Sequence, residues 1–119
     1  MSLPSLSEKD PKPYFDQPEM IKQTAEQLKK DMEQFGEEIN FSGNIATAYS
    51  ELFTQTQPFI QKLIDTNYQK LLQVLYRIDV SEKMISAAVN EGNEISSVIT
   101  RLILFRELQK GVVRNPYGK

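Results

Sequence analysis

The sequence predicts an all-α protein, and two observations carry this prediction. Apolar residues recur at spacings of three and four along most of the chain, which is the period of an amphipathic helix. No two segments show the alternating pattern that a pair of strands requires. The 119 residues fit a single domain. We therefore expect an antiparallel four-helix bundle with one extra short helix and an irregular N-terminal arm.

The arm is expected to cover residues 1–16, where Pro4, Pro11 and Pro13 interrupt any regular structure. Residues 1–3 resemble a cloning remnant, and the start lacks the basic and apolar regions of a signal peptide. No apolar run approaches the roughly 18 residues of a membrane span. We expect a cytoplasmic protein without membrane insertion, with the bundle at residues 17–111 and a short basic tail at 112–119.

The first helix is predicted over residues 18–35, because Pro18 suits a first helical position and Gly36 suits the residue after the end. Its apolar residues lie within an arc of about 80°: Ile21, Ala25, Leu28, Met32 and Phe35. So narrow a stripe indicates a peripheral helix. Residues 37–43 are expected to form a loop that is anchored by Ile39 and Phe41.

The second and third helices are predicted over residues 44–55 and 58–78, separated at Pro58. Proline cannot donate a hydrogen bond to the carbonyl four residues earlier, so a helix stops or kinks there. We favour a stop with Thr56 as the cap, and the alternative is one long kinked helix. The apolar face of residues 58–78 spans about 220°, which indicates a central helix with neighbours on two sides.

The fourth and fifth helices are predicted over residues 80–90 and 94–110. Asp79 followed by Glu82 has the spacing of a capping box, and Asn93 can cap the last helix. Gly111 is expected to end that helix.

Two polar residues interrupt the apolar faces, and such interruptions point to functional positions. Asn67 lies among apolar residues of the third helix, where it either fixes the helix register or lines a pocket. Arg106 lies at the centre of the apolar stripe of the fifth helix. Its side chain either extends to solvent at the end of the bundle, pairs with an acid, or forms an anion site with Arg101 or Arg77. The candidate acids are Asp65, Asp79 and Glu82.

Leu104 and Leu108 lie opposite the main apolar stripe of the fifth helix, and Val112 and Tyr117 follow them. Together they predict an apolar patch that needs a partner. The alternative is that the arm or the 37–43 loop covers the two leucines.

The absence of cysteine and histidine excludes zinc fingers, disulfide scaffolds and histidine-based catalysis. No glycine-rich phosphate loop or nucleophile elbow is present. We therefore expect no enzyme activity, no cofactor and no metal site. Residues 101–119 carry five bases and one acid, which complements the dipole at the end of the fifth helix.

The function that these observations favour is a non-catalytic interaction protein that forms a homodimer or binds a protein partner through the fifth helix. The alternative is a weak DNA-binding regulator in which the fourth and fifth helices form a helix-turn-helix. Against it, the recognition helix would open with Glu94 and would present Ser96, Ser97 and Thr100, with no basic residue before Arg101. A pI of about 5.2 also opposes attraction to nucleic acid.

Overall fold

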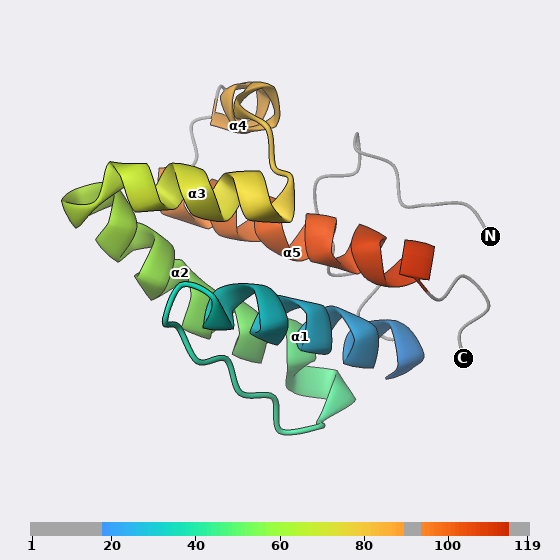
Figure 1. Cartoon of the computed structure of the whole chain (residues 1–119). Helices are drawn as coiled ribbons and strands as arrows, with labels where there is room; N and C mark the ends of the chain where they lie inside the picture. Colours follow the sequence, from blue (N-terminus) through green and yellow to red (C-terminus); the bar gives the residue numbers. More distant parts are fainter. Residues whose placement is uncertain (1–17, 90–93, 115–119) are drawn as a thin grey trace.

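The computed structural model describes residues 18–89 and 94–114, and the all-α prediction is confirmed (Figure 1). Within these ranges the chain forms five α-helices and a short 3₁₀ turn, and it forms no strand. The elements are α1 (Pro18–Glu33), the turn η2 (Ile45–Thr47), α2 (Ala48–Thr66), α3 (Tyr68–Ile78), α4 (Glu82–Val89) and α5 (Ile95–Arg114). The predicted arm at 1–16 lies outside the described residues.

The central element is α5, which packs against α1, α2, α3 and α4 (Figure 1). Apolar residues occur on nearly all sides of this helix, and a helix of that kind is stable only when neighbours surround it. Its residues in the main core are Val98, Ile99, Leu102, Ile103 and Leu104. They meet Ile21, Leu28 and Met32 of α1, which form the narrow stripe that the sequence predicted. The predicted central position of residues 58–78 is therefore taken by α5.

The break between the second and third helices lies at Asn67, so the predicted stop at Pro58 is wrong. The helix α2 continues through Pro58, and Pro58 is exposed. The carbonyl of Thr54, which in a regular helix would accept a hydrogen bond from residue 58, also lies on the exposed side. At Asn67 the backbone leaves the helical region, with φ −154° and ψ 76°. An antiparallel four-helix bundle is not confirmed, because α2 and α3 are two separate arms that meet at this residue (Figure 1).

Asn67 serves both helices that it separates. Its N–H donates to the carbonyl of Leu63 at 2.9 Å and closes α2. Its side-chain oxygen accepts from the N–H of Lys70 at 3.1 Å and caps α3. Asn67 is exposed, so neither the buried register position nor the pocket position predicted for it is correct. An amide among apolar residues marked a helix boundary here because its oxygen accepts from a backbone N–H that the first turn of α3 leaves unpaired.

We expect Asn67→Ala to lower the free energy of unfolding by about 1 kcal/mol, because the N-terminus of α3 loses its cap. Urea denaturation followed by circular dichroism measures this change. Asn40→Ala is the control, because Asn40 is exposed and only its backbone forms hydrogen bonds, to Gln55. Equal stability of the two variants would contradict a capping role for Asn67.

Residues 34–44, which we call the connector, join α1 to η2 and are held against α2. As predicted, Ile39 is buried and Phe41 packs against the core. The backbone of Asn40 exchanges two hydrogen bonds with Gln55, and Ser42 donates two to Glu51. Hydrogen bonds from Thr47 and Ser42 hold the pKa of Glu51 below its ordinary value. The connector therefore has a defined path along α2.

Two helix boundaries differ from the prediction. Asp79 ends α3 in the left-handed conformation, with φ 73°, and Ser81 caps α4 through its hydroxyl, so α4 begins at Glu82. Asp79 therefore closes one helix and does not open the next. The helix α5 continues through Gly111 to Arg114, although Gly111 was expected to end it. A glycine costs a helix about 1 kcal/mol but does not by itself end it.

Candidate functional site

The apolar patch predicted on the fifth helix is not formed by Leu104 and Leu108. Both side chains have 0% exposure, and Leu104 belongs to the main core. The physical reason is that α5 is enclosed by its neighbours, so the side opposite the main stripe is also covered. Tyr117 and the side chain of Val112 lie outside the described part of the structure. The predicted interface required these leucines to be exposed, and this expectation is wrong.

The arginine predictions are resolved by ion pairs. Arg106 is paired with Asp79, at 2.9 Å between Nη2 and Oδ2, so the predicted pairing with an acid is confirmed. Its Nε also donates to the Asp79 carbonyl at 3.3 Å. Arg77 pairs with a different acid, Asp31. Arg101 is half-buried, and its Nε has no partner among the described residues. The arginines are therefore not brought together as an anion site.

The residues that would read DNA in the helix-turn-helix alternative are not available at the surface. Ser96 and Thr100 have no exposed area, and Thr100 donates its hydroxyl to the Ser96 carbonyl at 2.7 Å. Ser97 accepts from Gln57 of α2 at 2.8 Å. The two serine hydroxyls bond to Gln57 and attach α5 to α2, whereas the Thr100 hydroxyl bonds within α5, so the three do not present a recognition face.

Charged and polar side chains meet where α1, α3 and α5 pack together, and the two acids and the glutamine among them are buried. We call this set the charge cluster: Gln27, Asp31, Arg77, Glu107 and Lys110. Lys110 Nζ lies 3.0 Å from Asp31 Oδ2 and 3.2 Å from Glu107 Oε1. Arg77 Nε lies 3.2 Å from Asp31 Oδ1, and Gln27 Nε2 lies 3.2 Å from each oxygen of Asp31. One buried carboxylate thus joins three helices.

The two carboxyl groups of the cluster carry different charges. Burial, followed by interaction with Asp31, raises the pKa of Glu107 to about 9. Burial opposes ionisation of Asp31 too, but hydrogen bonds from Glu107, Lys110 and Gln27 outweigh it and hold the pKa of Asp31 below its ordinary value. Lys110 Nζ, 3.2 Å from Oε1, favours the ionised form of Glu107, but burial and the interaction with Asp31 outweigh it. As an acid Glu107 donates its O–H to Asp31, so the pair carries one negative charge near neutral pH.

This arrangement supports a structural role for the cluster. Asp31 is 1% exposed and Glu107 is fully buried, so a substrate could reach them only if the helices separated. Within the described ranges, no three acidic side chains gather as a set of metal ligands. The cluster therefore specifies how α1, α3 and α5 pack.

The outer side of α3 presents aromatic residues to solvent. Tyr68, Leu72 and Tyr76 follow each other at intervals of four residues, and we call this stripe the α3 face. Tyr76 is 79% exposed and Tyr68 is 61% exposed, while Leu72 is half-buried. Shallow hollows lie on both sides of Leu72 and Tyr76. Large exposed aromatic side chains are enriched at protein interfaces.

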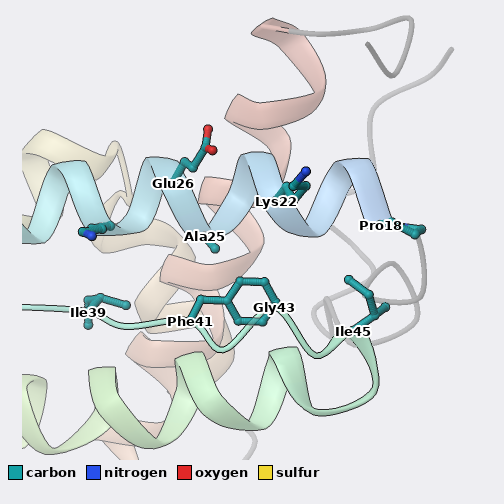
Figure 2. A pocket seen from close by; sticks show the side chains of 9 residues that line it. Pro18, Lys22, Ala25, Glu26, Ile39, Phe41, Gly43 and Ile45 are labelled. Atoms are coloured by element: carbon teal, nitrogen blue, oxygen red, sulfur yellow. The ribbon is translucent and has the colours of Figure 1, made fainter.

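A groove of about 450 Å³ lies between α1 and the connector (Figure 2). We call it the α1 groove. Its apolar floor includes Ala25, Phe41 and Ile45, and Ala25 points toward the connector in Figure 2. Lys22, Glu26 and Lys29 of α1 form its polar edge, and Figure 2 shows Glu26 directed away from the connector. A hollow of this size with an apolar floor is typical of a binding site.

No protein-family model matches the sequence, and comparison with curated proteins and with solved structures finds no similar chain. None of the described helices is long and apolar enough to span a bilayer.

The charge cluster was not predicted, although the sequence contains a signal for it. Ser96, Thr100 and Glu107 interrupt the apolar residues of the fifth helix. A helix with apolar residues on all other sides is expected to be central, so its polar stripe must be buried as well. A buried Glu107 then requires a proton or a cation, and Lys110 lies three residues away. The α3 face was also not predicted. Residues 58–78 were expected to form a single helix with a broad apolar face, and Leu72 was taken as part of that face.

Proposed function

We propose that this protein is a non-catalytic interaction protein that forms a homodimer through the α3 face. The observation that supports the proposal is the exposure of Tyr68 and Tyr76 on the same side of a helix as Leu72. Tyrosine provides a large contact area at a low cost in conformational entropy, which makes it frequent in interfaces. The interaction surface that we propose thus lies on α3 and not on α5.

A second copy of the chain is the partner that fits this stripe. The order tyrosine, leucine, tyrosine at intervals of four residues reads the same in both directions. A two-fold axis at Leu72, with the two α3 helices antiparallel, places Tyr68 of each copy beside Tyr76 of the other copy. The hollows beside Tyr76 can accept side chains from the opposite helix. Since α3 is only about 17 Å long, we expect a weak dimer that dissociates on dilution.

Light scattering after size exclusion tests the proposal. The wild-type protein is expected to approach twice the monomer mass of 13.7 kDa at high concentration. The double variant Tyr68→Glu/Tyr76→Glu is expected to remain monomeric and folded, because both side chains are exposed. The control is Gln34→Glu/Ser50→Glu, which adds the same charge at exposed positions of the connector and α2. The homodimer is wrong if the wild type is monomeric throughout, or if the control dissociates equally.

A further inference from the structure

We propose that the α1 groove binds an amphipathic helix of another protein, one that carries two acidic residues seven positions apart with apolar residues between them. This site is separate from the α3 face, and neither surface depends on the other. In combination, the two surfaces would make the protein a dimeric adaptor. The proposal rests on the shape of the groove, on its charges and on their spacing.

The floor of the groove is apolar and is built before any partner arrives. Phe41 and Ile45 are partly buried and pack against the core, so their positions are fixed from below. The connector wall is fixed by the hydrogen bonds of Asn40 and Ser42 to Gln55 and Glu51 of α2. Binding of a partner therefore costs this chain little conformational entropy. The apolar side chains of the partner can enter the groove directly (Figure 2).

Two lysines lie beside this floor and have no acidic partner in the part of the chain that the structure describes. Lys22 and Lys29 are exposed, and neither forms an ion pair with any residue that the structure describes. They are seven residues apart, which places them about 10 Å from each other along α1 and only about 20° apart around it. Glu26 is farther from the floor, because it is turned about 100° from Ala25, compared with about 60° for Lys22. The α1 edge of the groove therefore carries a positive charge near each end, with Glu26 between the two lysines and turned farther from the floor.

This spacing favours a helical partner. Two α-helices have the same rise per residue, so acids seven positions apart on one helix face lysines seven positions apart on the other. Residues three and four positions after the first acid lie on the same side of the partner helix, between the two acids. If they are apolar, they lie over Ala25 and the groove floor. The small side chain of Ala25 leaves room for the approach.

Fluorescence anisotropy with a dye-labelled, capped helical peptide tests the proposal. The probe has glutamates seven positions apart, leucines three and four positions after the first glutamate, and glutamine and alanine elsewhere. The control peptide has the same composition, but each glutamate is moved two positions along, which turns both by about 200° around the helix. We expect saturable binding of the probe and at least about tenfold weaker binding of the control, because its acids cannot reach Lys22 and Lys29 while its leucines are seated.

A matched pair of protein variants assigns the binding to the groove. Lys22→Glu/Lys29→Glu is expected to weaken binding of the probe by about tenfold or more, since two attractions become two repulsions. Lys30→Glu/Lys62→Glu makes the same change in net charge at exposed lysines that do not line the groove. This control is expected to weaken binding by less than about threefold. Backbone amide signals of Ala25, Phe41 and Ile45 are expected to shift on titration with the probe.

Several results would overturn the proposal. Equal affinity for the two peptides would show that the position of the acids relative to the leucines is irrelevant. Equal losses in the two double variants would show a general charge effect. Amide shifts confined to α3 would place the peptide on the other surface. If dodecanoate displaces the probe and binds more tightly than it does, the groove is a site for small amphiphiles and not for a helix.

Discussion

Glu107→Gln is expected to raise the free energy of unfolding by about 3 kcal/mol near pH 7. In the folded protein Glu107 keeps its proton up to a pKa of about 9, whereas its ordinary value is 4.5. Between these two values unfolding releases a proton, so the wild-type protein loses stability as the pH rises, by up to about 1.4 kcal/mol per pH unit. Glutamine does not titrate, and its amide can donate to Asp31 in place of the acid.

The pH profile distinguishes this effect from a simple packing change. Asp31 contributes stability that is present above its ordinary pKa of 3.8 and is lost as the pH falls through its lower folded value. With Glu107, this places the stability maximum of the wild type near about pH 4 to 5. Urea denaturation of wild type and variant near pH 5 and near pH 8 is expected to show a small difference at the first pH and a large one at the second.

The control for this experiment is Glu33→Gln, because Glu33 is exposed on α1 two residues after Asp31. It is expected to change the free energy of unfolding by less than about 0.5 kcal/mol at either pH. If Glu107→Gln has no larger effect than Glu33→Gln near pH 8, then Glu107 is ionised in the folded protein. The charge cluster would then hold two negative charges against Lys110 and Arg77.

The sequence was sufficient to predict the fold class and most of the helices. The stripe of α1 and the two anchors of the connector depend on local patterns of apolar residues, and they appear where these patterns place them. Arg106 was also assigned correctly, because an arginine in an apolar stripe near a helix end has few ways to satisfy its charge. Each of these features depends on the residue pattern of a single helix or loop, or on the need of one charged side chain for a partner.

What could not be predicted depends on the arrangement of several helices. Pro58 stops a helix only when the unbonded carbonyl before it cannot be hydrated, and here it lies on the exposed side. Asn67 caps a helix because α3 turns back toward α5, which no single helical wheel can show. The burial of Leu104 and Glu107 depends on the helices that pack around α5, which the pattern of α5 alone does not show. The same packing moved the candidate interface from α5 to the outer side of α3.

Leu104→Glu is expected to unfold the protein and not merely to dissociate an oligomer. The substitution removes a core leucine, which costs about 2 to 5 kcal/mol, and places a carboxylate where no described cation is available to it. The carboxylate adds several kcal/mol, so the sum approaches the whole stability of a small domain, about 5 to 15 kcal/mol. Circular dichroism is expected to show loss of the helical signal.

Leu104→Met separates this effect from any special sensitivity of the position. Methionine keeps most of the volume and adds no charge, so the loss of stability is expected to stay below about 1.5 kcal/mol. An exposed Leu104 would give the opposite result for Leu104→Glu, a folded protein with a cooperative unfolding transition. Together with the folded monomer expected for Tyr68→Glu/Tyr76→Glu, this comparison determines which helix faces a partner and which is the core of the domain.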